Sequence, residues 1–134
     1  CAQQAGIAGS REALVAIVRY IVDDVDRSLT FLETLGFTLV DRMGPPFAIM
    51  ERDGLELWVS GPGTSARRAL ADGSLPQPGG WNRLVIEVDD LDATVDQLTA
   101  TGARLRSKPI SGPGGRQVLV EDPSGNPIEL FESR

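Results

Sequence analysis

The chain has 134 residues, of which 41% are hydrophobic and 24% charged, the ordinary composition of a single soluble globular domain. A net charge of −6 disfavours nucleic acid as a partner, and no apolar stretch approaches the ~20 residues of a membrane span. The one cysteine, Cys1, excludes a disulfide framework and makes a reducing cytoplasm the expected compartment.

The first half of the chain predicts one strand, one helix and three further strands. Residues 1–12 are expected to form a disordered lead-in, because 2–10 are small and polar without periodicity. The apolar, β-branched run Ala13 to Val22 predicts a strand. Asp24 is a candidate N-cap for a helix that Gly36 would end. The three further strands are expected at 37–42, 47–51 and 55–60.

The second half predicts the same order of elements after a connector rich in glycine and proline, 61–80. Within this connector, 64–71 could form a short turn of helix. A connector of this length is expected to cover the cleft as a lid or to pack against a partner subunit; the alternative is a solvated linker. Asp90 is the second candidate N-cap, and Gly102 the second helix stop. The expected strands are 83–88, 104–107, 117–121 and 127–132, the last two joined by a turn at 122–126.

The two halves are related in sequence as well as in pattern. Val22-Asp23-Asp24-Val25-Asp26 returns 66 residues later as Val88-Asp89-Asp90-Leu91-Asp92. A repeat of this length indicates two copies of one module that bury their apolar faces together. We therefore expect an α+β fold in which residues 13–134 form one domain from two βαβββ modules, 13–60 and 81–132, that enclose a shared cleft.

The tandem modules and two motifs resemble the vicinal oxygen chelate superfamily, which includes glyoxalase I, extradiol dioxygenases, fosfomycin-inactivating enzymes and bleomycin-resistance proteins. The motifs are Val120-Glu121-Asp122-Pro123-Ser124-Gly125-Asn126-Pro127-Ile128-Glu129-Leu130 and Val22 to Leu29 with Leu35-Gly36-Phe37. The resemblance spans about 14–132 and implies a homodimer, but it leaves the reaction open because function resides in the site rather than in the fold.

In metal-dependent members of this superfamily, each module supplies one ligand from its first strand and one from its last. The resemblance places Ile17 and Arg83 at the first-strand positions and Glu56 and Glu129 at the last-strand positions. Isoleucine has no donor atom and a guanidinium repels cations, so two carboxylates remain, fewer than a transition metal needs. No cofactor is therefore expected. A hard divalent cation between Glu56 and Glu129, or a buried ion pair of Arg83 with either carboxylate, stays open.

Aromatic and basic residues complete the candidate ligand-binding set. Trp58 shares a strand face with Glu56, and Trp81 shares one with Arg83, so both indoles are candidates to line the cleft. Phe47 on the expected third strand offers an apolar wall, and Arg116 would reach an anionic group from a loop. Each of these residues also fits an ordinary structural role.

The sequence contains no histidine, which rules out catalysis of the Ser–His–Asp or Cys–His kind. Binding and sequestration of a small organic molecule or antibiotic without a transition metal is the favoured function, since it requires only shape, aromatic walls and a few polar anchors. Two alternatives stay open. One is a glyoxalase-, lyase-, isomerase- or dioxygenase-like enzyme that uses Glu56 and Glu129 with or without a divalent metal; the other is a scaffold with a vestigial cleft.

Overall fold

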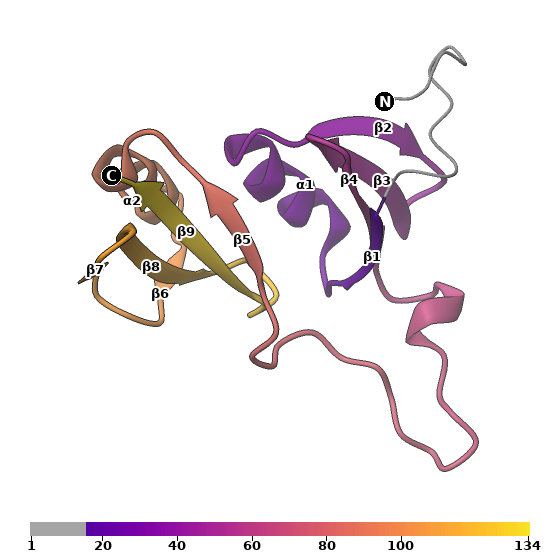
Figure 1. The fold of residues 1–134 in the computed structure, drawn as a ribbon. Coiled ribbons are helices and arrows are strands. Elements are labelled where there is room, and N and C mark those ends of the chain that lie inside the picture. The colour runs from indigo at the N-terminus through magenta and orange to yellow at the C-terminus, as the bar shows by residue number, and fades with distance from the viewer. Residues whose placement is uncertain (1–15) are drawn as a thin grey trace.

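The computed structural model describes residues 16–134, so the expected lead-in 1–12 and the start of the first predicted strand lie outside the described residues. Two modules follow one another along the chain (Figure 1). The first contains β1 (Ala16–Ile21), α1 (Val25–Thr34), β2 (Thr38–Arg42), β3 (Phe47–Arg52) and β4 (Leu55–Ser60). The second contains β5 (Leu84–Glu87), α2 (Leu91–Ala100), β6 (Arg104–Leu105), β7 (Ile110–Gly112), β8 (Gly115–Glu121) and β9 (Pro127–Ser133). The α+β class and the tandem βαβββ order are confirmed.

The two helices begin and end in the same way, as the repeated sequence predicts. The Asp24 side chain accepts a hydrogen bond from the Arg27 backbone N–H at 3.1 Å, and Asp90 accepts one from Ala93 at 3.0 Å. These caps satisfy backbone donors that the first helical turn leaves without partners. Both helices stop before a glycine in the left-handed region, Gly36 at φ 90° and Gly102 at φ 95°.

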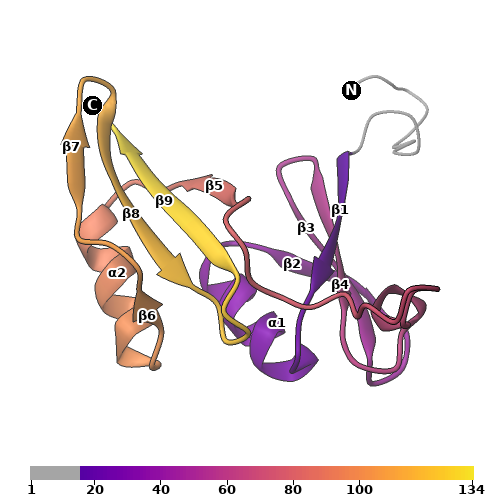
Figure 2. The ribbon, with the colours of Figure 1, turned by 90° about the horizontal axis from the view of Figure 1, so that it is seen from below.

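Each module builds its own sheet, with the first strand parallel to the last. The strand orders are β1-β4-β3-β2 in the first sheet and β5-β9-β8-β6 in the second, where β7 also pairs with β8. The helix α1 lies between the two sheets, whereas α2 lies on the outer side of the second sheet (Figures 1 and 2). Both modules contribute to one apolar core, in which Leu32, Leu57, Leu98 and Leu130 are almost fully buried.

The second sheet contains one strand that the sequence did not predict. The expected strand 104–107 ends at Leu105, and a further short strand, β7, begins at Ile110; both pair with β8. Pro109 has no N–H to donate to a ladder, and the Ser107 hydroxyl, rather than a backbone carbonyl, accepts the Leu119 N–H at 3.0 Å. The segment is therefore one strand interrupted where side-chain chemistry replaces the backbone pairing.

The connector 61–80 holds one turn of 3-10 helix, Ser65–Arg67, and no other helix or strand. Arg67 attaches the first part of the connector to the residues that follow β1. The Arg67 guanidinium donates to the Val22 carbonyl at 2.6 Å and pairs with Asp23 at 3.3 Å. No helix in the described part of the chain is both long and apolar enough to cross a membrane.

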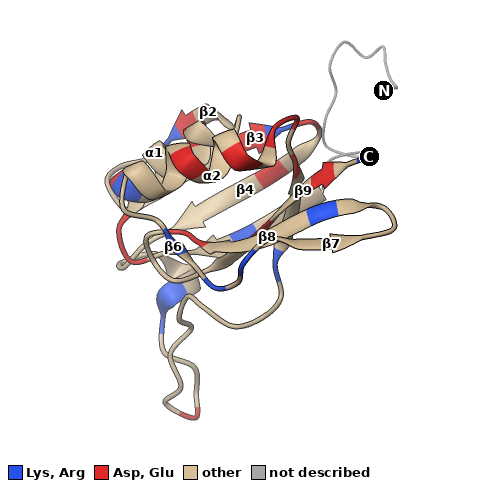
Figure 3. Ribbon diagram, turned by 90° about the vertical axis from the view of Figure 1, so that its left-hand side faces the viewer, with Lys and Arg blue, Asp and Glu red and all other residues tan. Residues whose placement is uncertain are grey.

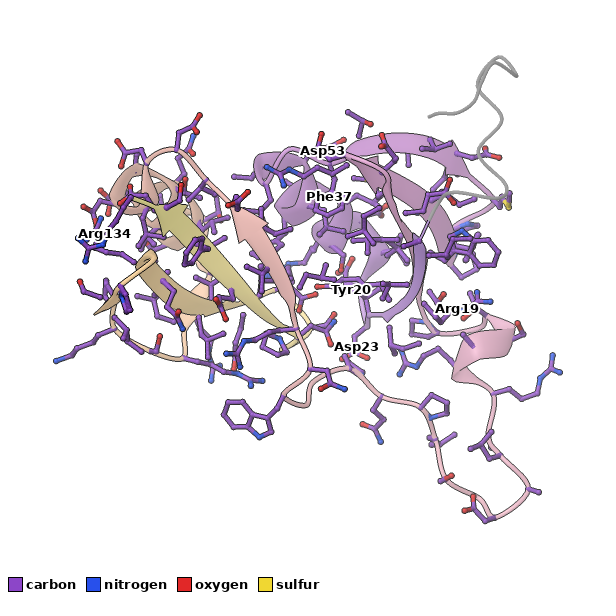
Figure 4. The ribbon with its side chains drawn as sticks, in the orientation of Figure 1. Arg19, Tyr20, Asp23, Phe37, Asp53 and Arg134 are labelled. Carbon is purple, nitrogen blue, oxygen red and sulfur yellow. The ribbon has the colours of Figure 1, made fainter. Side chains whose placement is uncertain are left out.

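A polar junction joins the modules where β1 meets the β8–β9 turn. The Tyr20 hydroxyl donates to Asp122 Oδ2 at 2.6 Å in a buried contact. Asn126 donates to the Ile21 carbonyl at 2.7 Å and to Asp122 at 3.0 Å. Arg19 and Tyr20 leave β1 in opposite directions (Figure 4), as neighbouring strand residues must. Tyr20 therefore faces the junction, whereas Arg19 lies on the other face of β1.

Candidate functional site

The first sheet carries a cluster of aromatic and charged side chains on the face opposite the junction. The guanidinium carbon of Arg19 lies 4.9 Å from the centroid of the Trp58 ring, a cation–π contact that follows from their cross-strand pairing. Phe47 packs edge-on against Trp58 with centroids 6.1 Å apart. The Trp58 indole N–H donates to Glu56 Oε1 at 3.1 Å, and Glu56 is only 2% exposed. Three predicted residues, Glu56, Trp58 and Phe47, are thus brought together.

The second sheet carries the other predicted carboxylate in an ion pair. Arg83 Nε lies 3.1 Å from Glu129 Oε1, with side chains 31% and 12% exposed. The sequence placed Ile17 and Arg83 at equivalent first-strand positions, but the strand register does not. Glu56 lies opposite Ile17, whereas Glu129 lies opposite Val85. Arg83 precedes β5 and reaches Glu129 diagonally along the sheet.

A pocket of about 360 Å³ lies between the first strands of the two modules. Arg19 lines it from β1, and Arg83 lines it from the approach to β5. The rest of the wall consists of Val18, Tyr20, Ile21, Gln77, Gly79, Asn82, Leu84, Asn126 and Pro127. Arg83 is the only predicted site residue in this wall. Trp58 and Glu129 do not line the pocket, but each contacts an arginine that does: Trp58 contacts Arg19, and Glu129 contacts Arg83.

The remaining predicted residues lie elsewhere in the second module. Trp81 is 70% exposed and stacks on Arg106, whose guanidinium carbon lies 4.7 Å from the ring centroid. Arg116 pairs with Asp92 at 3.0 Å and with Glu132 at 3.4 Å. The hydrogen bonds that Arg116 donates, first to Asp92 and then to Glu132, raise the pKa of its guanidinium. Neither Trp81 nor Arg116 lines the pocket.

The donors present do not fit a transition metal. Within residues 16–134, no group of three or more His, Cys, Asp or Glu side chains is placed to hold a metal ion. The strand partners of Glu56 and Glu129 are Ile17 and Val85, which have no donor atoms, and a guanidinium already engages Glu129. Zinc, nickel or iron would require three or four N, O or S ligands. We therefore assign no reaction step to a metal.

Sequence reasoning missed three residues of this region: Arg19, Tyr20 and Asn126. Arg19 is the one charge in the run 13–22, and that isolated charge was the signal that could have identified it. Tyr20 is 7% exposed, and burial, with the neighbouring Asp122 carboxylate, raises the pKa of its hydroxyl well above the usual 10.0. The contacts of Asn126 with the other module follow from tertiary structure alone.

Comparisons with known proteins agree with this architecture. A family model described as the Glyoxalase/Bleomycin resistance protein/Dioxygenase superfamily matches residues 14–130. An uncharacterized protein of Mycolicibacterium smegmatis is 28% identical over 117 residues, covering 87% of this chain and 91% of that protein.

Two solved structures have the same fold. A superfamily member from Sphaerobacter thermophilus is 28% identical with a TM-score of 0.67, covering 90% of this chain and 98% of that chain. TnmS3, described as an antibiotic binding protein from a Streptomyces species, is 24% identical with a TM-score of 0.63, covering 90% and 95%. The family match, the tandem modules and the paired sheets lead to one conclusion: this chain belongs to the Glyoxalase/Bleomycin resistance protein/Dioxygenase superfamily.

Proposed function

We propose that this protein binds a small planar organic molecule without chemical change, in the pocket between β1 and β5, and so sequesters it without a transition metal. The observation that carries the proposal is the pair of arginines that line one pocket, Arg19 from β1 and Arg83 from the position just before β5. The volume of about 360 Å³ falls within the usual range for small-molecule sites, roughly 300–1,000 Å³.

The contacts of the two arginines indicate the chemistry of the ligand. Arg19 is held against the face of Trp58, a contact that consumes none of its N–H donors. Arg83 is engaged at Nε by Glu129, which leaves donors on its other nitrogens. Val18, Leu84 and Pro127 supply apolar wall. A flat molecule with carbonyl or phenolate oxygens would satisfy the donors and bury its rings against the apolar residues.

The antibiotic-binding description of TnmS3 supports a binding function for this fold. The two glutamates favour binding over acid–base catalysis, because Glu129 is ion-paired and Glu56 is buried beside the Trp58 indole. A general base must reach the proton that it removes, and neither glutamate lines the pocket.

A homodimer is part of the same proposal. The strands β1 and β5 are edge strands of their sheets, and each exposes an apolar residue, Ile17 at 49% and Val85 at 55%. Exposed apolar residues on edge strands favour pairing with a second copy. Since the candidate pocket lies between these strands, a partner there would also enclose a bound ligand.

A thermal-shift and tryptophan-fluorescence screen of aromatic antibiotics and aromatic metabolites tests the proposal. A ligand should raise the unfolding midpoint in a saturable way and change the emission of Trp58. The variant Arg19→Gln should bind it at least about tenfold more weakly, a loss of roughly 1.4 kcal/mol. The control Arg68→Gln removes the same charge from an exposed connector residue and should bind normally.

Equal affinity in the Arg19→Gln variant would refute the proposed site. Failure of every aromatic compound to bind would instead favour the scaffold alternative. Turnover of a bound compound, lost in Glu56→Gln or Glu129→Gln, would favour the enzyme alternative.

A further inference from the structure

A second pocket, larger than the first, lies on the helix side of the molecule. Its volume is about 590 Å³, and it is bounded by α1, by the chain from the end of α2 into β6, and by the β8–β9 turn. It shares no lining residue with the pocket between β1 and β5. An inference about this pocket is therefore independent of the proposed function.

One face of α1 forms a wall of this pocket. Arg27, Thr30, Phe31 and Thr34 follow the i, i+3, i+4, i+7 spacing that places residues on one side of a helix. Another face of α1 is buried in the core through residues such as Leu32. The wall-forming face is thus turned toward the second module, where α1 lies between the two sheets (Figure 2).

Both carboxylates of this pocket already have partners within the protein. Glu121 pairs with Arg106 at 2.8 Å, and Asp122 accepts the hydrogen bonds of Tyr20 and Asn126. A bound cation would have to compete with these partners. A cationic ligand would therefore find Glu121 in an ion pair and Asp122 engaged by hydrogen bonds.

Two guanidinium groups at the pocket remain available. Arg27 forms no ion pair with any residue of the described range. Arg104 is 84% exposed and lies 3.8 Å from Glu121, a distant pair in solvent. Arginine binds carboxylates through two parallel N–H donors, so each group is suited to an anion.

Part of the pocket lining is apolar. Phe31, which is 6% exposed, lines the pocket together with Ala103 and Pro123. We propose that this pocket binds a small organic carboxylate, with the carboxylate against Arg27 and Arg104 and an aromatic or hydrocarbon part on Phe31 and Pro123. Figure 3 shows acidic bands on the neighbouring α2, and the chain carries a net charge of −6. Arg27 and Arg104 therefore supply local positive charge on an acidic protein, and that charge would attract an anion.

Two-dimensional amide NMR with three carboxylate probes tests this site: benzoate, phenylacetate and 3-phenylpropionate, each with its uncharged amide as comparison. At least one carboxylate should shift the backbone amide signals of Thr30, Phe31 and Ser124 in a saturable way. The matching uncharged carboxamide compound should not shift them. The double variant Arg27→Gln/Arg104→Gln should weaken binding at least tenfold. The control double variant Arg68→Gln/Lys108→Gln removes the same charge from exposed residues outside both pockets and should bind normally.

Two results would overturn the inference: no saturable shift with any of the three carboxylates, or unchanged affinity in the Arg27→Gln/Arg104→Gln variant. If the control variant weakens carboxylate binding equally, the loss of affinity comes from the change in net charge alone, and the inference is overturned as well. The variant Arg19→Gln should leave carboxylate binding intact, so that failure of this site and failure of the pocket between β1 and β5 are distinguishable.

Discussion

At the scale of single residues, a buried hydrogen bond between Tyr20 and Asp122 joins the two modules. Tyr20 is the only tyrosine of the chain, and its hydroxyl donates to a carboxylate at 2.6 Å. Replacing it with phenylalanine leaves Asp122 without that donor. A hydrogen bond to a charged group contributes about 1.5–3 kcal/mol, so we expect Tyr20→Phe to lower the free energy of unfolding by about that amount, measured by urea denaturation.

The same residue predicts how stability changes at alkaline pH. Because folding raises the pKa of Tyr20, its contribution is fully present below the unfolded value of about 10 and is lost as pH rises toward the higher folded pKa. The tyrosinate absorbance of the native protein should therefore appear only above pH about 10, as the chain unfolds. Tyr20→Phe should lose less stability than wild type over that interval. Titration of Tyr20 at its ordinary pKa in the folded protein would contradict this prediction.

At the scale of elements, the hairpin between β7 and β8 depends on one glycine. Gly115 has φ 150°, and a Cβ there would lie 2.0 Å from the Glu132 carbonyl oxygen of the adjacent strand β9. Gly115→Ala should therefore destabilise the protein by at least about 2 kcal/mol, through backbone strain and displacement of β9. Gly114→Ala is the matched control, since its Cβ would meet only Phe131 Cζ at 3.6 Å. Equal unfolding midpoints for the two variants would refute the requirement at Gly115.

The elements also show what local sequence determines. The helices were predictable because Asp24, Gly36, Asp90 and Gly102 are local start and stop signals, which tertiary contacts did not override. The interrupted strand of the second sheet was not, because its break depends on Ser107 bonding to Leu119, twelve residues away. The site divides in the same way. Local strand periodicity was enough to place Glu56 and Trp58 on one strand face and Phe47 on a neighbouring strand. The pocket between the modules depends on how β1 packs against the second module, which local sequence does not determine.

At the scale of the whole molecule, the homodimer proposed above makes Val85 an interface residue. Replacing it with glutamate would place a charge in an apolar contact, a cost that exceeds the roughly 1.4 kcal/mol of a tenfold change in affinity. Val85→Glu should therefore raise the dimer dissociation constant at least about tenfold in sedimentation equilibrium. Leu70→Glu is the matched control, because Leu70 has a similar exposure, 60% against 55%, but lies in the connector. A monomeric wild type, or a Val85→Glu variant that dimerises as tightly as Leu70→Glu, would remove β5 from the interface and leave the pocket between β1 and β5 as a site within one chain.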